Sequence, residues 1–292
     1  ALFSILQEKE IQVRGFKLRL PLEIQFIFTA NPEDYTNRGS IVTPLKDRIG
    51  SQILTHYPHS LSIAKKITEQ EAQISKEKAA NIHLPEIAKD LLEQIGFEAR
   101  KSEYVDAKSG VSARMSITAC ENLYSTAERR LLITQDEKTS IRMTDFLGVV
   151  SAINGKIELV YEGEQEGANE VSFHLISMSI KTLFPKYFPK IEKLEKPNEN
   201  GPYYEILEWF FKDNELFFED DLNEQQYCKI LDDVPGLSKI IKKHLIDLDE
   251  KDHYFMMEFL LWGLESHQKL NKLRRLEGIY FKDSLGSFIN KL

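Results

Sequence analysis

An apolar segment that runs into a proline constrains this chain more than any other feature. Residues 24–28 read IQFIF, a run of apolar and aromatic side chains that is typical of a buried β-strand. Pro32 then holds Asn31 in an extended conformation, so the strand is predicted to end there. A polar loop follows, and residues 45–48, LKDR, precede a second short apolar run. We therefore expect a polar amide at the tip of a buried strand, with an arginine shortly downstream.

This stretch resembles the AAA+ ATPases, and within them the class of the magnesium-chelatase I subunit and MoxR. In that class the sensor strand ends in T-x-N-P, which residues 29–32 match, and L-x-D-R follows, which residues 45–48 match. The resemblance implies that Asn31 is the sensor 1 residue, which positions the attacking water. It also implies that Arg48, beside Asp47, is the arginine finger that reaches the nucleotide of the neighbouring subunit.

The arginines of this loop leave two alternatives open. A guanidinium is always charged and forks onto phosphate oxygens, so it stabilises the charge that grows during phosphoryl transfer. In the first alternative, Arg48 only forms a surface ion pair with Asp47 or Glu33 and has no catalytic role. In the second, Arg38 of the same loop is the residue that acts across the subunit boundary.

Residues 11–20 predict a two-stranded hairpin. Apolar and polar side chains alternate on both sides of Gly15, which is the pattern of two paired strands joined by a tight turn. Residues 6–8, LQE, followed by Val13, Gly15 and Pro21, resemble the end of the family's post-Walker-B helix and its pre-sensor hairpin. An ordinary edge hairpin is the alternative, and either interpretation leaves Arg14 and Arg19 in solvent.

The chain lacks the parts of the family's ATP site that hold the phosphates. No G-x-x-x-x-G-K-[ST] motif occurs, and the Gly155-Lys156 pair has no glycine-rich loop before it. No apolar strand ending in Asp-Glu precedes the sensor strand; residues 245–250 mimic one but read as a helix end and a cap. We interpret the chain as the C-terminal portion of a longer ATPase. ATP or ADP with Mg²⁺ is expected in the complete parent protein, and we expect this chain alone neither to bind ATP tightly nor to hydrolyse it.

Composition restricts the classes of partner. The 292 residues are 42% hydrophobic and 29% charged, as in globular proteins, and the net charge of -8 gives no bulk attraction to nucleic acid or to an anionic membrane. No apolar run approaches the length of a membrane span. Cys120 and Cys228 lack metal-ligand spacing, so they are predicted to be buried thiols of a cytoplasmic protein, and no metal site is expected.

Residues 60–154 predict a helical lid. Residues 62–77 are rich in Lys, Glu, Gln and Ala and predict an amphipathic helix, and Pro85 is placed to open a second one. Residues 112–114, SAR, resemble the S-x-R opening of the family's sensor 2 helix. The resemblance implies that Arg114 lies in the first turns of this helix and reaches the γ-phosphate of its own subunit.

Residues 155–292 predict a separate, mainly helical domain. The acidic, glycine-containing segment 162–169 is interpreted as a solvated linker rather than a metal site, since no histidine or regular ligand spacing accompanies it. Apolar periodicity predicts helices over 171–184 and 203–211, a helix capped by Asn223, and a longest helix over 252–273.

Two features of this domain leave alternatives open. The last helix is predicted to end in a basic cluster, which the helix dipole favours, and nucleic-acid binding is the other interpretation. The cluster consists of Lys269, Lys272, Arg274 and Arg275. The aromatic helices are predicted to form a domain core, and an exposed docking face for a partner is the alternative.

The sequence therefore predicts a predominantly α-helical protein that begins with a remnant of an AAA+ α/β core. The core remnant covers residues 1–59, the helical lid residues 60–154 and the C-terminal domain residues 155–292. The resemblance implies a homo-oligomeric ring that couples ATP hydrolysis to remodelling of a protein client or to metal insertion. The alternative is a non-enzymatic adaptor that docks a client with the lid and the C-terminal helices.

Overall fold

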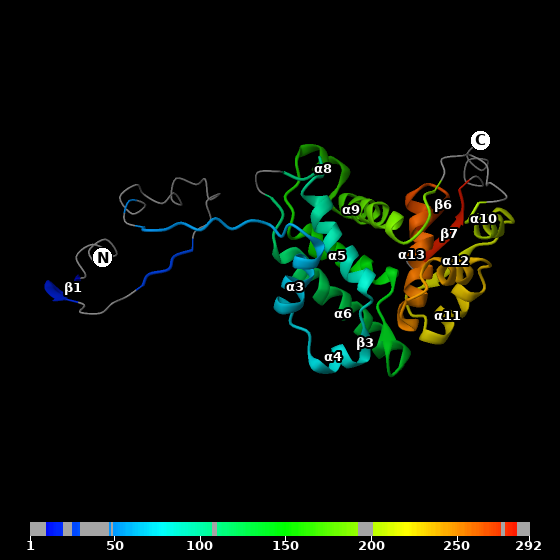
Figure 1. The fold of residues 1–292 in the computed structure, drawn as a ribbon, viewed down its shortest axis with the longest axis horizontal. Coiled ribbons are helices and arrows are strands. Elements are labelled where there is room, and N and C mark those ends of the chain that lie inside the picture. The colour runs from blue at the N-terminus through cyan, green and yellow to red at the C-terminus, as the bar shows by residue number, and fades with distance from the viewer. Residues whose placement is uncertain are drawn as a thin grey trace. The chain divides into compact units, whose positions relative to one another are not determined.

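Contacts within the chain fall into two units, Ala1–Tyr57 and Pro58–Leu292 (Figure 1). The structure is a computed structural model. It describes residues 10–19, 25–29, 47, 49–106, 110–191, 201–275 and 278–284.

The first unit contains the predicted hairpin. Strand β1 (Glu10–Val13) pairs antiparallel with β2 (Phe16–Arg19), with Glu10 opposite Arg19 and Val13 opposite Phe16. Both residues between the strands have positive φ, 50° at Arg14 and 87° at Gly15, which gives a two-residue turn whose twist matches that of the strands. The hairpin prediction is confirmed, and Arg14 and Arg19 are exposed as expected.

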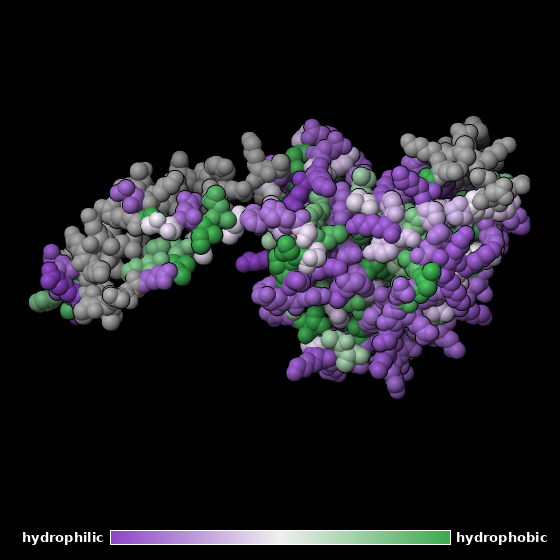
Figure 2. All heavy atoms as spheres, in the orientation of Figure 1, coloured by the Kyte–Doolittle hydropathy of each residue, from purple (hydrophilic) through white to green (hydrophobic). Residues whose placement is uncertain are grey.

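The predicted buried strand over residues 24–28 is wrong for the part that the structure describes. Residues 25–29 form no strand, and Phe26, Ile27 and Phe28 are exposed. The segment 51–57 also forms no strand, so apolar side chains lie on the surface of this unit (Figure 2). A buried strand needs a partner strand and a covering apolar face. Among the described residues of this unit, the only sheet is the hairpin, whose strands pair with each other.

The first helices of the second unit begin at serines that cap them. Ser60 Oγ accepts a hydrogen bond from Ile63 N (3.4 Å) at the start of α3 (Leu61–Glu71). Ser75 Oγ accepts one from Lys78 N (3.2 Å) at the start of α4 (Lys76–Asn81). The single helix predicted over 62–77 is therefore two helices, because the second serine cap starts a new one.

The remaining elements of the predicted lid follow in order. Helix α5 (Glu86–Ala99) begins after Pro85, as predicted, and α6 (Arg114–Thr134), with 21 residues, is the longest described helix. A 3₁₀ helix η1 (Met143–Val149) leads into α7 (Val150–Asn154). The short strands β3 (Ile82–His83) and β4 (Thr139–Ser140) pair in parallel and connect the loop before α5 to the loop before η1.

The C-terminal elements are helices around a small antiparallel sheet. The helices are α8 (Tyr161–Glu166), α9 (Ala168–Leu183), η2 (Phe184–Lys186), α10 (Tyr204–Phe211), α11 (Glu224–Asp232), α12 (Leu237–His244), η3 (Glu250–Asp252) and α13 (His253–Ser266). The sheet has the order β5-β7-β6, formed by β5 (Leu216–Glu219), β6 (Leu270–Arg275) and β7 (Gly278–Asp283), with Leu216 opposite Phe281 and Leu270 opposite Asp283.

Several local predictions for this region are confirmed. Helix α9 ends just before Pro185, and α10 covers the predicted aromatic segment. Asn223 caps α11: its side chain accepts from Gln226 N (2.8 Å), and the Gln226 side chain accepts from Asn223 N (3.1 Å).

Two predictions for this region are wrong. Residues 161–166 form α8 rather than an acidic loop, and the helix predicted over 252–273 ends at Ser266. The basic cluster beyond it lies largely on β6, which pairs with β7. Helix α13 is buried on nearly every side. Its sequence therefore lacks the pattern of one apolar and one polar face, whose loss would mark the end of the helix.

A single hydrophobic core runs through the second unit and crosses residue 154. It includes Leu91 and Leu123 from the predicted lid and Leu175 and Phe259 from the predicted C-terminal domain. The ring of Phe184 packs so closely on α13 that a Cβ at Gly263 would lie 2.1 Å from it. The described residues thus form a predominantly helical protein, while the division into three domains stays a prediction. No described helix has both the length and the apolar character that crossing a bilayer requires.

Candidate functional site

Arg114 is the first residue of α6, as the sequence predicts. Its side chain is exposed, and its guanidinium forms no ion pair within the described part of the chain. Ser112 Oγ accepts a hydrogen bond from Arg114 N at 3.3 Å, so the serine of the S-x-R pattern stabilises the helix start. The positive end of the helix dipole and a permanent cation therefore coincide at this point, which is suited to an anion.

The start of α6 is held in place from two sides. Ser112 N donates to Lys156 O (3.0 Å), which pairs the chain before the helix with the segment that follows α7. On the other side, Met115 is buried and its Cε lies 3.4 Å from where a Cβ would be at Gly96 of α5. Arg114 therefore projects from a fixed backbone rather than from a loop.

A buried carboxyl reinforces this contact between α5 and α6. Glu93 is only 5% exposed, and Thr68 Oγ1 donates to its Oε1 at 2.6 Å. Burial raises the pKa of Glu93, and the hydroxyl hydrogen bonds from Thr68 and Ser116 only partly oppose that rise. Ser116 belongs to the first turn of α6, so Glu93 ties that turn to α3 and α5.

The other predicted site residues are not brought together with Arg114. Asp47 is an exposed turn residue in the first unit. Asn31, Arg38 and Arg48 lie outside the described residues, so their assignments as sensor 1, alternative trans-acting residue and finger stay predictions.

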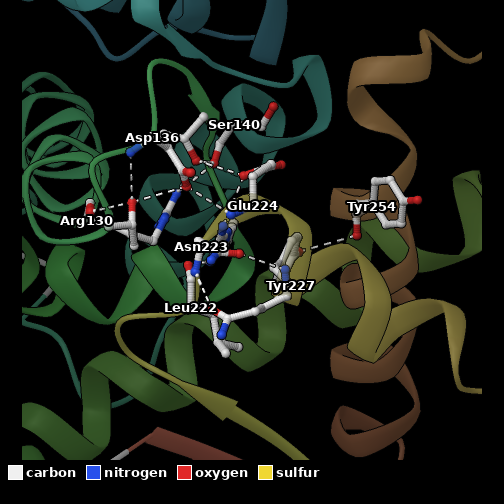
Figure 3. Close-up of polar contacts among 12 residues, drawn as sticks. Arg130, Asp136, Ser140, Leu222, Asn223, Glu224, Tyr227 and Tyr254 are labelled. Atoms are coloured by element: carbon white, nitrogen blue, oxygen red, sulfur yellow. Dashed lines mark hydrogen bonds and ion pairs between the residues drawn. The ribbon is translucent and has the colours of Figure 1, made fainter.

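The far end of α6 enters a buried polar network (Figure 3). Arg130, 5% exposed, forms an ion pair with Asp145 of η1, which is 2% exposed. Its guanidinium also donates to Thr139 Oγ1 (3.1 Å) and to Ser140 O (2.8 Å). Asp145 accepts in addition from Arg142 N (2.8 Å). Arg130 thus joins α6, β4 and η1.

Arg142 continues this network into the C-terminal helices. Its buried guanidinium donates to Leu222 O (2.8 Å) and to Glu224 Oε2 (3.0 Å), and it lies 4.1 Å from the ring centre of Tyr227. Glu224 is the first residue of α11, and its backbone N–H donates to Asp136 Oδ2 at 2.9 Å. The start of α11 is therefore bonded to the predicted lid through both its side chain and its backbone.

Glu258 makes the deepest of these connections. This residue of α13 is 0% exposed, and its carboxylate accepts from the backbone N–H groups of Met143 (2.9 Å) and Thr144 (3.1 Å) at the start of η1. It also accepts from Tyr227 Oη (2.7 Å) and Trp262 Nε1 (3.2 Å). Burial raises the pKa of Glu258, while these hydrogen bonds lower it by a smaller amount. The carboxylate acts as the N-terminal cap of a helix far away in the sequence.

Side chains outside this network also form polar contacts across residue 154. Examples are His83 Nε2 with Asp252 Oδ1 (2.5 Å), Thr182 Oγ1 with Glu98 Oε1 (3.1 Å), and Tyr187 Oη with Asp90 Oδ2 (3.2 Å). Together with the shared core and the contacts of Glu258, they attach the helices that follow residue 154 to α5, β3 and η1.

Sequence reasoning missed this network. One feature of the sequence could have indicated a buried role for Glu258: it is the lone charged residue within the apolar run 255–264. Arg142 and Glu224 left none, because each is an ordinary charged residue until the fold brings them together. In the described residues, no group of His, Cys, Asp and Glu side chains is arranged to hold a metal ion.

Comparisons with protein-family models, with curated proteins and with solved structures found no match for this chain.

Proposed function

We propose that this chain is part of a ring-forming ATPase of the AAA+ type, in which Arg114 senses the bound nucleotide and the second unit transmits the response to a protein client. The observation that carries the proposal is the exposed cation at one end of α6. The other end of this helix is joined to η1 by the buried Arg130–Asp145 ion pair, and η1 is bonded in turn to α13 through Glu258. The motifs at Asn31 and Arg48 support the same interpretation.

Arg114 is suited to sensing but not to holding a nucleotide. Its guanidinium can fork onto the oxygens of a terminal phosphate, and it loses that partner when the phosphate leaves. The sequence has no glycine-rich loop to cradle the phosphates. When bound, ATP with Mg²⁺ would supply the anion that Arg114 contacts, and it would be held mainly by a phosphate-binding loop N-terminal to this chain.

The network explains how a local change at Arg114 would be carried further. Arg114 and Arg130 are separated by about 24 Å along the helix, from a rise of about 1.5 Å per residue. Because α6 is a continuous helix, a rotation at its start also moves Arg130 and the groups bonded to it. Asp145, Arg142 and Glu258 connect that end to η1, α11 and α13. We therefore propose that the lid and the C-terminal helices move as one body.

ATP turnover tests the proposal. The assay compares this chain with the chain extended by its upstream coding sequence, each with and without Arg114→Ala. We expect no turnover from this chain alone. In the extended protein, Arg114→Ala should lower turnover about tenfold to a hundredfold, which corresponds to loss of about 1.5–3 kcal/mol from a charge-assisted contact. Arg129→Ala, an exposed arginine on the same helix, is the matched control and should leave turnover unchanged. Equal turnover in the two variants would contradict the sensing role.

A second candidate function is client binding without ATP hydrolysis. The observation that favours it is a large charged cleft on the second unit, lined by α9 and the β6–β7 hairpin. The ATPase and the adaptor functions make different predictions for capture of a client by the full chain when neither nucleotide nor a ring is present. Nucleotide-independent capture by the monomeric chain supports the adaptor, whereas capture that requires ATP supports the motor.

A further inference from the structure

A cleft of about 1200 Å³ lies between α9 and the β6–β7 hairpin, elements that Figure 1 labels in the C-terminal part of the second unit. Its apolar lining includes the partly exposed Leu147 and Phe173 and the buried Val171, Ile176 and Trp262. The volume exceeds the range of about 300–1000 Å³ that is common for small-molecule pockets. The cleft is therefore large enough for a segment of polypeptide.

Two arginines of the cleft have no carboxylate partner within the described part of the chain. The guanidinium of Arg274 lies 5.0 Å from the ring centre of Phe173, and that of Arg275 lies 4.8 Å from the ring centre of Tyr280. Stacking on a ring holds a guanidinium in one orientation and leaves its N–H edge open to an anion. Both side chains are exposed, so a ligand can reach them.

Lys272, the third cation of the cleft, already has partners. Its ammonium lies 3.7 Å from the ring centre of Trp262 and forms an ion pair with Glu265 at 3.1 Å. Burial lowers the pKa of Lys272, and Glu265 opposes that shift. The cation that remains for a ligand in the cleft is therefore Arg274, because Arg275 stacks on Tyr280 on the opposite face of β6.

The carboxylates of the cleft argue against a polyanionic ligand. Glu166, Glu170 and Asp220 also line it and form no ion pair within the described residues. Nucleic acid or an anionic lipid surface would face these charges at close range and be repelled. A polypeptide can place a carboxylate on Arg274 and a lysine or arginine on the glutamates, because its side chains differ along the chain.

The sheet offers a further feature to an extended chain. Among the described strands, β6 is at the edge of the order β5-β7-β6 and pairs only with β7. Edge strands present backbone groups with which an added segment can form hydrogen bonds, and helix-and-edge-strand grooves bind peptides in this way. The six residues of β6 extend over about 20 Å, the length of a peptide of about six residues.

We infer that this cleft binds an extended segment of a protein client, which places a carboxylate on Arg274, a basic side chain near Glu166 and Glu170, and an apolar side chain against Leu147 and Phe173 of the lining. The inference concerns client recognition. It does not depend on ATP hydrolysis, so its test uses no nucleotide and its outcome is separate from that of the Arg114 assay.

A displayed library of random twelve-residue peptides, selected on the full chain, tests the inference. We expect enriched peptides to contain at least one Asp or Glu, one Lys or Arg and one large apolar residue. By fluorescence anisotropy, Arg274→Glu should weaken binding of an enriched peptide about tenfold, whereas Arg275→Glu, on the opposite face of β6, should weaken it less. Arg129→Glu makes the same charge change on α6, away from the cleft, and should have no effect.

Two further measurements separate recognition from loss of fold. Circular dichroism melting should give the same midpoint for the wild-type chain and the three variants, since all three arginines are exposed. Replacing the peptide carboxylate by lysine should weaken binding to the wild-type chain and restore binding to Arg274→Glu. Bound peptide should also slow amide hydrogen exchange in β6. The inference is overturned if no peptide is enriched, if Arg274→Glu binds as the wild type does, or if single-stranded oligonucleotides bind and peptides do not.

Discussion

Removal of the Glu258 carboxylate should destabilise the second unit more than removal of any exposed carboxylate on its surface. Four hydrogen-bond donors converge on this side chain, from Met143 N, Thr144 N, Tyr227 Oη and Trp262 Nε1, within 2.7–3.2 Å. Each buried donor left without a partner costs about 1–3 kcal/mol, so Glu258→Ala should cost at least about 4 kcal/mol. That is a large fraction of the stability of a typical domain, about 5–15 kcal/mol.

Glu258→Gln should lower the free energy of unfolding by less than Glu258→Ala does, because most of the hydrogen bonds to this side chain can still form. Met143 N and Tyr227 Oη both donate to Oε2, and an amide nitrogen at that position would face both donors. The Tyr227 hydroxyl can turn to accept, whereas Met143 N cannot. One buried donor is then left unsatisfied, and we expect a loss of about 1–3 kcal/mol.

Urea unfolding at pH 7, followed by tryptophan fluorescence, measures both losses. Glu250→Gln, an exposed carboxylate of η3, is the matched control and should change the free energy of unfolding by less than about 0.5 kcal/mol. Amide exchange of Met143 and Thr144 should accelerate in Glu258→Ala. If Glu258→Ala unfolds within about 1 kcal/mol of the wild type, the carboxylate does not hold η1 and the reasoning is refuted.

Three further changes have defined outcomes. Arg130→Met leaves Asp145 as a buried charge without its cation and should cost about 3–5 kcal/mol in urea unfolding, whereas Arg129→Met next to it should cost less than about 0.5 kcal/mol. Asn223→Ala removes the N-terminal cap of α11 and should lower the free energy of unfolding by about 1 kcal/mol. A Gln→Ala change at an exposed position elsewhere on the surface should leave it unchanged. Glu93→Gln should have a free energy of unfolding at pH 7 at least as large as that of the wild type, because the amide avoids burying a charge. If the free energies of unfolding of the two proteins depend on pH in the same way, this prediction is contradicted.

The pH dependence of the Glu93 prediction follows from the direction of its pKa. The folded-state pKa of Glu93 is raised above its ordinary value of 4.5 by burial. The Glu93 carboxyl is therefore protonated at a higher pH in the folded protein than in the unfolded chain. The stability that this protonation contributes is lost as pH rises through the folded-state pKa. The advantage of Glu93→Gln over the wild type should thus shrink as pH falls from 7 towards 4.5, which urea unfolding at several pH values would measure.

The features that could be predicted from sequence are those with local causes. Gly15 allows the positive φ that a two-residue hairpin turn needs, Pro185 prevents α9 from continuing, and Asn223 supplies a side-chain acceptor three residues ahead of its donor. The position of Arg114 at a helix start belongs to this group as well, because the serine two residues earlier bonds its backbone.

The features that sequence reasoning missed depend on distant partners. Residues 270–275 became a strand because β7 supplies hydrogen bonds, although their Lys and Arg content reads as a helix end. The exposed side chains of residues 26–28 show the reverse case, because this apolar run joins no sheet among the residues that the structure describes. Arg142 and Glu224 are 82 residues apart, and no local pattern predicts that they meet.

The most direct measurement of the central claim is the distance between the helices of residues 60–154, the predicted lid, and those of residues 155–292, obtained by spin labelling the full chain. Labels at Lys66→Cys on α3 and Lys243→Cys on α12 occupy exposed positions. Burial raises the pKa of Cys120 to about 12 and that of Cys228 to about 11, which keeps both native thiols unreactive, and Cys228→Ser removes the less buried one. If the two parts move as one body, the wild-type background gives a single narrow distance distribution, and Glu258→Ala broadens it. A broad or two-peaked distribution in the wild-type background would contradict the claim.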